Sequence, residues 1–236
     1  MNIIFLTFGS HDNYLDAGNR IINQAKELNI FRDTILYTSE DLQNDPDFWT
    51  KHSDFITKNK RGYGYWLWKS YITKKTMDTM ADGDILLYLD CGCELDLSRK
   101  EKLLECIHIV NTDKIVGTTA SPHKERRWNK MDVVEKLDMN KAEYLNTDQR
   151  QAGTNLFLVC KETRLLVNEW YELCCEYHNI DDSPSIIKNV SDFREHRHDQ
   201  SVFSLLTKKY KLFSKTTLGN AILYVRNRTG ASTIGV

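Results

Sequence analysis

The chain has 236 residues, enough for a single domain over residues 1–236 that buries ~70–75% of the surface its unfolded chain exposes. Lysine and arginine number 32 and aspartate and glutamate 33, so no strong overall field favours nucleic acid or an anionic membrane as a partner. The longest apolar runs fall far short of the roughly 20 residues that cross a bilayer, and no secretory leader stands first, so we expect a cytoplasmic protein without a transmembrane segment.

The first elements alternate between strand and helix. Residues 2–8 form a β-rich run that ends at Gly9 and Ser10, residues 15–28 carry apolar residues at helical spacing, and residues 34–38 form a second strand. A strand, a helix and a strand in this order predict a right-handed βαβ unit. The chain therefore begins a mostly parallel sheet.

The alternation continues to residue 118. Residues 66–80 favour a helix, and residues 85–90 form a strand that is almost wholly apolar, which is typical of a central strand covered on both faces. A helix over 98–110 and a strand over 114–118 follow. This pattern predicts an α/β fold with a twisted sheet flanked by helices.

The second half of the chain is less regular. Residues 120–155 are polar, with one helical stretch at 128–137, and a segment this long between core strands is more often a binding lid or an insertion than a linker. The remaining expected elements are a strand at 154–160, a helix at 161–177, a loop at 181–193, a helix at 200–208 and a strand at 221–226. Six cysteines in a chain of this size favour free thiols over a disulfide framework.

Acidic residues follow the central strand. Asp90 stands at its carboxyl end, where open α/β sheets bind ligands, and Glu94 offers a second carboxylate nearby. Two oxygen donors suit Mg²⁺ or Mn²⁺, completed by diphosphate oxygens and water. The alternative is that Asp90 caps a turn and Glu94 is solvated. Cys91 and Cys93 are a weak zinc signal, because no second Cys/His pair stands nearby at zinc-ligand spacing.

Residues 61–69 read RGYGYWLWK and are unusually aromatic. Arg61 and Lys69 could supply charge to a diphosphate, and the four aromatic rings between them could stack on a base or a sugar. The alternative is ordinary core, since Trp66 and Trp68 cannot share one helical face and at least one should pack inside.

Two later clusters are polar where an element begins. The Gln151 amide, ahead of an apolar strand, could bond sugar hydroxyls, although a plain turn explains it equally well. Asp199, at the start of a helix, suits a carboxylate base, a metal ligand or an N-cap. His198 could complete a metal shell or be structural.

In their order along the chain, these four clusters resemble the motif series of GT-A glycosyltransferases. The strand ending at Asp90 resembles their metal-binding DxD strand, residues 151–153 resemble a segment that contacts the donor sugar, and Asp199 resembles the start of their later Asp-Gln segment. Together with residues 181–185, the clusters also resemble a family of glycosyltransferase-like proteins of large DNA viruses and bacterial polysaccharide loci, over roughly residues 3–210.

Two positions depart from the GT-A pattern. Gly92 stands where the second acid of the DxD is expected, so the second acidic contact must come from Glu94, from Asp199 or from neither. No histidine follows His198, which leaves His196 or His198 as the late metal ligand that many GT-A enzymes have.

The resemblance implies a GT-A fold and transfer of a sugar from a nucleotide-diphosphate sugar, with a UDP-sugar favoured, to a glycan or glycoprotein acceptor, assisted by Mn²⁺ or Mg²⁺. Asp90, Glu94 and His198 would hold the metal, and Asp199 would accept the acceptor's proton if the enzyme inverts configuration. The expected donor-binding residues are Thr7, Phe8, Gly9, Arg61, Tyr65, Lys69 and Gln151. The expected acceptor wall lies in residues 120–150 and includes Arg126, Arg127 and Trp128.

Two other functions remain open. A nucleotidyltransferase also uses an α/β sheet, a metal and a nucleotide, but it would normally carry a glycine-rich basic loop after the first strand, and residues 9–12 are not one. A non-catalytic protein that binds sugar nucleotides is the second alternative, and turnover of the donor would separate it from an enzyme.

Overall fold

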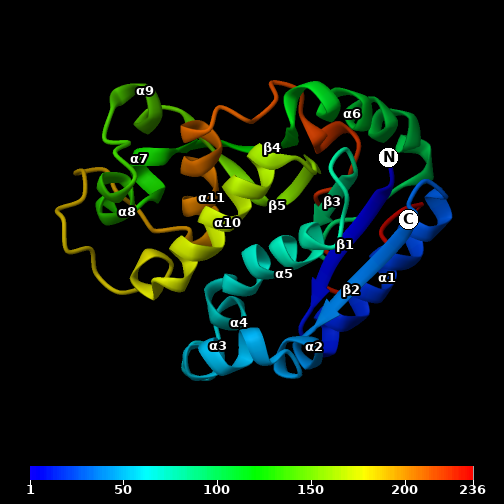
Figure 1. Cartoon of the computed structure of the whole chain (residues 1–236), viewed down its shortest axis with the longest axis horizontal. Coiled ribbons are helices and arrows are strands. Elements are labelled where there is room, and N and C mark those ends of the chain that lie inside the picture. The colour runs from blue at the N-terminus through cyan, green and yellow to red at the C-terminus, as the bar shows by residue number, and fades with distance from the viewer. Residues whose placement is uncertain (236) are drawn as a thin grey trace.

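A computed structural model describes residues 1–235. Its sheet contains β1 (Ile3–Gly9), β2 (Asp33–Thr38), β3 (Ile85–Leu89), β4 (Ile115–Lys124) and β5 (Asp148–Leu158), in the order β2-β1-β3-β5-β4 (Figure 1). The longer helices are α1 (Asp12–Leu28), α3 (Pro46–Lys58), α5 (Leu67–Asp78), α6 (Lys100–Asp113), α10 (Lys161–Cys175) and α11 (His198–Lys209). The shorter ones are α2 (Ser39–Gln43), α4 (Gly62–Tyr65), α7 (Glu125–Trp128), α8 (Met131–Lys136) and α9 (Ala142–Leu145), with 3₁₀ turns at Leu97–Arg99, Tyr177–Asn179 and Leu218–Asn220.

Strand direction determines which residues meet at the edge of the sheet. β2, β1 and β3 are mutually parallel, and β5 runs antiparallel to both β3 and β4, so all strands but β5 point the same way. The mostly parallel α/β fold is therefore confirmed, and the reversal of β5 is a difference from the expected pattern. Because of it, the middle of β5 lies beside the end of β3, where the Asp90 N–H donates to the Gly153 carbonyl at 2.8 Å.

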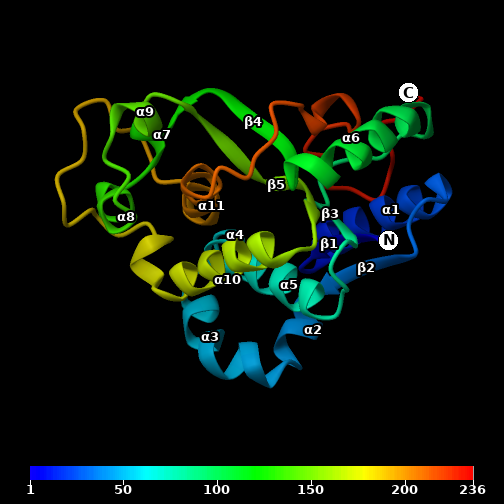
Figure 2. The ribbon, with the colours of Figure 1, turned by 45° about the horizontal axis from the view of Figure 1, so that its top comes forward.

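Helices cover both faces of the sheet. Successive residues of a strand point to opposite faces, so Phe5 and Leu87 pack with α1 and α6, while Leu6 and Tyr88 pack with α5, α10 and α11. Figures 1 and 2 show the two helical layers, with α1 and α6 on one side of the strands and α5, α10 and α11 on the other. Burial on both faces explains why β3 is wholly apolar.

Three parts of the chain differ from the expected elements. Residues 39–58, where the sequence analysis predicted no element, form α2 and α3. The segment 120–155 contains the end of β4, three short helices and the start of β5. The expected strand at 221–226 is wrong, because its one ladder contact is the bridge between Glu94 and Leu223, and Arg226 then leaves the extended region at φ +53°.

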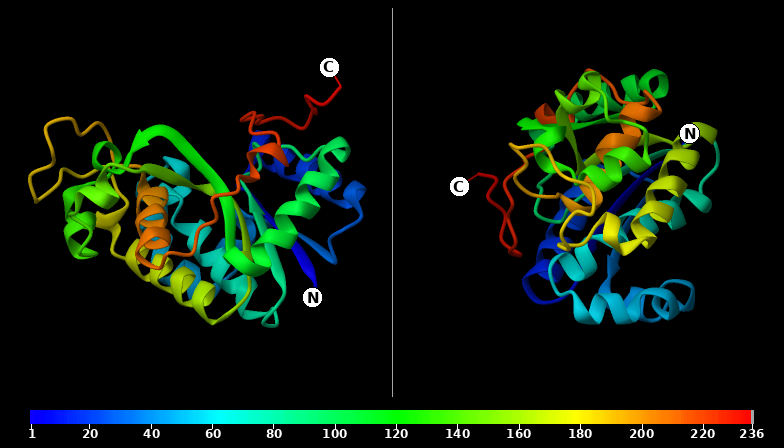
Figure 3. Two further views of the ribbon diagram at one scale, coloured as in Figure 1. Left: turned by 90° about the horizontal axis from the view of Figure 1, so that it is seen from above. Right: turned by 90° about the vertical axis from the view of Figure 1, so that its left-hand side faces the viewer.

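Among residues 1–235, all six cysteines are free thiols. No helix in this part of the chain is both long enough and apolar enough to cross a bilayer. The segment 221–235, red in Figure 3, runs along the outside of the molecule and contacts α1 through the Arg20 side chain.

Candidate active site

A cavity of about 920 Å³ opens at the edge of the sheet where β1 and β3 end, a size typical of small-molecule sites. Most of the predicted site residues line it, namely Phe8, Arg61, Lys69, Asp90, Gln151, His198 and Asp199. They come from the ends of β1 and β3, from within β5, from the residue before α4, from α5 and from the first turn of α11, so the fold gathers segments that are far apart in sequence. Thr7, Gly9, Tyr65 and Glu94 do not line the cavity.

A buried ion cluster lies in the cavity wall. The Lys69 ammonium is 3.1 Å from Asp90 Oδ1 and 3.5 Å from Asp199 Oδ2. Lys69 is only 3% exposed. Burial alone would lower the pKa of Lys69, but the fields of Asp199 and Asp90 outweigh burial and raise it. The site therefore holds a permanent positive charge between two carboxylates.

Asp199 is the most perturbed acid of the cavity. Burial raises the pKa of Asp199 to about 7. The charge of Lys69 opposes this shift, and the nearby charge of Asp90 adds to it. Asp199 Oδ2 accepts no hydrogen bond from the described residues. The N-cap alternative is wrong, because α11 is preceded by Arg197 as its cap residue and Asp199 lies inside the helix. A buried carboxyl that changes protonation near neutral pH can exchange a proton with a bound ligand.

Asp90 is oriented by its neighbours. Its Oδ1 accepts a hydrogen bond from the Tyr88 hydroxyl at 2.8 Å in addition to the Lys69 contact. Gly153 lies directly against the carboxylate, and a Cβ at that position would collide with it. Beside this pair, Gln151 lines the cavity with a side-chain oxygen that has no partner among residues 1–235. An unpartnered buried acceptor of this kind suits a ligand hydroxyl.

The structure does not bring the predicted metal ligands together. Glu94 is fully buried away from the cavity, where its carboxylate accepts hydrogen bonds from Gln24, Asn227, Ser232 and Thr233. Within residues 1–235 no group of three His, Cys, Asp or Glu side chains could hold a metal ion. The Lys69 ammonium also lies between Asp90 and Asp199, and its charge would repel a cation bound by both. The set of Asp90, Glu94 and His198 therefore does not fit Mn²⁺ or Mg²⁺.

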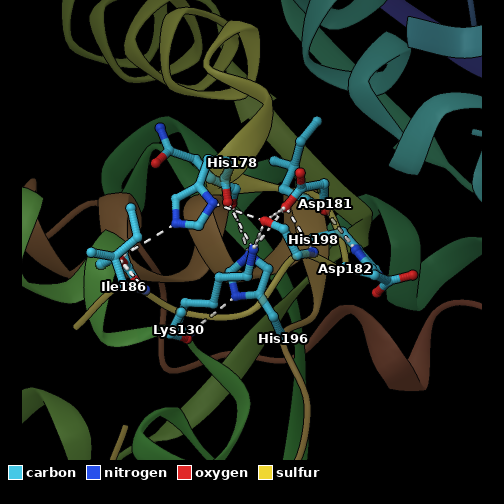
Figure 4. A network of polar contacts seen from close by, with 12 residues as sticks. Lys130, His178, Asp181, Asp182, Ile186, His196 and His198 are labelled. Atoms are coloured by element: carbon cyan, nitrogen blue, oxygen red, sulfur yellow. Dashed lines mark hydrogen bonds and ion pairs between the residues drawn. The ribbon is translucent and has the colours of Figure 1, made fainter. Parts of the chain in front are cut away.

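The two late histidines have different surroundings. His196 uses both ring nitrogens in the network of Figure 4, where Nδ1 accepts from the Lys130 N–H at 3.1 Å and Nε2 donates to the Asn179 carbonyl at 2.8 Å. Burial lowers the pKa of His196 to about 3. His198 Nδ1 donates to the Ile180 carbonyl at 2.7 Å, which leaves a lone pair on Nε2 with no hydrogen-bond partner among the described residues. Of the two, only His198 lines the cavity.

The RGYGYW stretch forms a left-handed turn. All five residues from Gly62 to Trp66 have positive φ, a region that residues other than glycine rarely adopt. At Gly62 a Cβ would overlap the Trp66 ring, so the first glycine is required by space as well as by φ. The turn places Trp66 and Trp68 in the cavity wall, and backbone strain of this kind is common at functional sites.

Arg61 and Tyr65, which belong to the same stretch, stabilise the cavity wall through contacts with other parts of the chain. The Arg61 guanidinium lines the cavity but is shared between the Asp182 carboxylate at 3.0 Å and Glu195 at 2.7 Å. Tyr65 is buried, and its ring stacks on His198 with centroids 4.9 Å apart. The structure thus places Tyr65 behind the cavity, and the charge of Arg61 is already balanced.

The end of β1 contributes fewer residues to the cavity lining than the sequence predicted. Thr7 is buried, and its hydroxyl donates to the Leu89 carbonyl at 2.7 Å, which ties β1 to β3. A Cβ on Gly9 would collide with the backbone of α1 at Tyr14, so this glycine permits close packing of the helix. Phe8 does line the cavity and stacks on Trp68 with ring centroids 3.8 Å apart.

A partly basic section of the lining was not predicted from the sequence. Arg197, Tyr224, Arg226 and Arg228 all face the cavity. No periodicity in the sequence identifies residues 224, 226 and 228, because this segment forms no strand and its backbone leaves the extended region at Arg226. The expected acceptor wall is not part of the lining; its Trp128 instead lies beneath Arg197, with the guanidinium carbon 4.1 Å from the ring centroid.

No protein-family model matches the chain, and no curated protein matches it in sequence. Among solved structures, the chain is similar to the apo crystal structure of mouse xyloside xylosyltransferase 1. The two share 12% sequence identity, the match covers 92% of this chain and 86% of that chain, and the TM-score is 0.47. A likeness of this size carries no argument about function. No comparison supports the narrower resemblance to proteins of large DNA viruses and bacterial polysaccharide loci.

Proposed function

We propose that the chain is a glycosyltransferase of the GT-A type that transfers a sugar from a nucleotide-diphosphate sugar, with a UDP-sugar favoured, to a glycan or glycoprotein acceptor. The observation that carries the proposal is the pair of Lys69 and Asp199 in a cavity at the strand ends, where a cation and an acid with a pKa of about 7 face the same space. The order of motifs along the chain adds to it.

Each reacting group has a counterpart in the cavity. The bond between the anomeric carbon and the diphosphate breaks, a bond to the acceptor oxygen forms, and the acceptor's proton moves to the Asp199 carboxylate. Lys69 stabilises the negative charge that develops on the leaving diphosphate. Gln151, with its unpartnered oxygen, accepts a hydrogen bond from a sugar hydroxyl. In this proposal the positive charge beside the leaving group comes from the chain rather than from Mn²⁺ or Mg²⁺.

A thermal-shift panel tests the proposal. Purified protein is heated with UDP, GDP, CDP, ADP and their sugar conjugates, and the best binder is then incubated with protein to detect release of its diphosphate. At 100 times Kd, a ligand that binds only the folded state should stabilise it by ~2.7 kcal/mol. No shift with any nucleotide contradicts the proposal. A shift without turnover of the donor or of any acceptor would indicate a binding protein, and pyrophosphate release from a nucleoside triphosphate would indicate a nucleotidyltransferase.

A further inference from the structure

The segment 221–233 is held firmly against the loop that follows β3. The Leu223 and Glu94 backbones exchange two hydrogen bonds of 2.9 Å, and the Asn227 N–H donates to the Gly92 carbonyl at 2.8 Å. Gly92 permits this approach, because a Cβ there would lie 3.3 Å from the Arg226 Cα. The glycine at the second acidic position of the DxD therefore has a structural reason in this chain.

Two buried charged side chains fasten the same segment. Arg20 donates to the Cys91 and Cys93 carbonyls at 2.7 and 3.0 Å and to the Asn227 carbonyl at 3.2 Å, so it joins the β3 loop to the segment. Glu94 accepts from the Asn227 side chain at 2.8 Å and from other donors of the segment. We call Arg20 and Glu94 the clamp. Both are more than nine-tenths buried, so the clamp faces the protein and not the cavity.

Between the fixed points at residues 223 and 227, the segment turns Tyr224 and Arg226 toward the cavity. Arg226 adopts φ +53°, a conformation that costs a residue other than glycine free energy and that the hydrogen bonds on either side maintain. Arg197, directly ahead of α11, also lines the cavity. Among the described residues, neither arginine has a carboxylate within ion-pair distance.

The charge balance of the cavity points to an anionic ligand. Arg61 and Lys69 are each paired with two carboxylates, whereas Arg197 and Arg226 have no carboxylate within ion-pair distance among the described residues. Burial lowers the pKa of Arg197; the charge of Glu195 opposes this shift and the charge of Arg226 adds to it. Two like charges facing one cavity repel each other unless an anion lies between them. Arginine is well suited to phosphate, because its planar fork donates two parallel hydrogen bonds.

We propose that Arg197 and Arg226 bind the diphosphate of the donor directly, and that the clamp is a positioning device that holds Arg226 at the cavity. The proposal rests on the proposed function, because it takes the anion to be a nucleoside diphosphate. It assigns to arginines the charge neutralisation that the motif resemblance would give to a metal, consistent with the misfit of Asp90, Glu94 and His198 as a ligand set.

Calorimetric binding to the full chain tests the proposal. The probes are the tightest binder among UDP, GDP, CDP and ADP together with its own nucleoside, each in EDTA and in Mn²⁺. We expect the diphosphate to bind in EDTA about as well as in Mn²⁺. Arg226→Ala and Arg197→Ala should each weaken it by ~10–100-fold, the range for a lost charged hydrogen bond, with nucleoside affinity unchanged. Arg226→Lys should lose less diphosphate affinity than Arg226→Ala. The control Arg32→Ala, at an exposed site, should keep the diphosphate affinity of the unmodified chain.

Three results overturn the proposal while leaving sugar transfer from a nucleotide-diphosphate sugar as the proposed function. The first is diphosphate binding that requires Mn²⁺, and the second is undiminished diphosphate binding by Arg226→Ala. The third is an equal loss of affinity for the diphosphate and the nucleoside, which would mean that the substitution changes the shape of the cavity wall and does not only remove a charge. Undiminished diphosphate binding by Arg226→Ala would also be the result if the two arginines bound an anionic acceptor instead of the diphosphate. Failure of the unmodified chain to bind any nucleoside diphosphate in either condition contradicts the proposed function itself, and this proposal with it.

Discussion

Asp199 is the residue on which the proposed chemistry depends most directly. In Asp199→Asn the side chain keeps its shape but cannot accept a proton, so the transfer rate should fall by ~10²–10⁴ while affinity for the nucleoside diphosphate changes little. Initial rates and calorimetry on the same preparation measure the two quantities. Asp138→Asn, at a side chain that is 95% exposed, is the control and should behave as the unmodified chain does. Near-normal transfer by Asp199→Asn would show that another group takes the proton.

The pH dependence of the reaction follows from the same residue. A base acts only when it is deprotonated, and the pKa of Asp199 is about 7, so kcat/KM should rise with pH up to about 7 and then level off. The profile is measured with a saturating acceptor between pH 5 and 9. In Asp199→Asn the residual rate should lack this inflection. A profile that instead falls as pH rises through 7 would mean that Asp199 acts as an acid.

Among the elements, the left-handed turn at residues 62–66 should be sensitive to substitution, because all five residues have positive φ. A residue with a Cβ pays ~1–2 kcal/mol in this backbone region, and Gly83, at φ +90° with open space around it, isolates that cost. Gly83→Ala should therefore destabilise the protein by about this amount, and Gly62→Ala by more, because its Cβ also meets the Trp66 ring. Urea unfolding measures both. Equal losses would mean that the ring moves aside freely.

Loss of the clamp should loosen the segment 221–233 and leave the rest of the fold intact. In Glu94→Gln the side-chain amide would present hydrogens to a site full of donors, so several charged hydrogen bonds are lost together. We expect faster proteolysis within residues 224–232, read by mass spectrometry, and weaker diphosphate binding, with Glu101→Gln on an exposed helix face as control. A segment that stays protected would show that Arg20 alone is sufficient.

The elements that the sequence predicted best are those whose signal is local. The strands before residue 90, α1 and α5 follow from apolar periodicity, which depends on neighbouring residues only. The direction of β5 was not predictable in this way, because a buried strand has the same composition in either direction. Helix α3 begins with Asp45 as its cap and Pro46 in its first turn, but its buried His52 interrupts the apolar stripe.

Prediction of the candidate site was also limited to local sequence signals. Asp90 and Glu94 look alike in the sequence, and strand geometry brings only Asp90 to the cavity, since Glu94 turns toward partners more than 130 residues later. Nothing local reveals those partners. The motif positions therefore located the cavity, while the individual contacts of Glu94, Arg61 and Tyr65 required the folded chain.

For the whole molecule, buried histidines set the response to acid. Burial lowers the pKa of His52 to about 4 and that of His196 to about 3, so both bind a proton on unfolding below their ordinary value of about 6.5. Their contribution to stability is therefore complete above pH 6.5 and is lost as the pH falls. Asp199 acts oppositely, because its raised pKa means that folding takes up a proton between about pH 4 and 7.

Burial also lowers the pKa values of His123 and His198, so four histidines oppose one aspartate. The free energy of unfolding should be nearly level between pH 7 and 8, and near pH 5 it should fall by at least ~1.4 kcal/mol per pH unit, the slope for one net proton. Urea unfolding at fixed ionic strength between pH 5 and 8 measures it. Asp199→Asn should steepen the fall, because the opposing group is gone. Stability that increases from pH 7 to pH 5 would show that Asp199 outweighs the histidines.

The position of Lys69 between Asp90 and Asp199 also bears on how a reaction cycle would end. A metal ion can depart together with the diphosphate that it neutralises, but a lysine cannot leave the chain. Under the proposed function, every contact between the product and the ammonium is broken at departure, so we expect release of the nucleoside diphosphate to be the slow step and accumulated product to compete with new donor. An enzyme built in this way depends on rapid removal of its product rather than on a supply of metal.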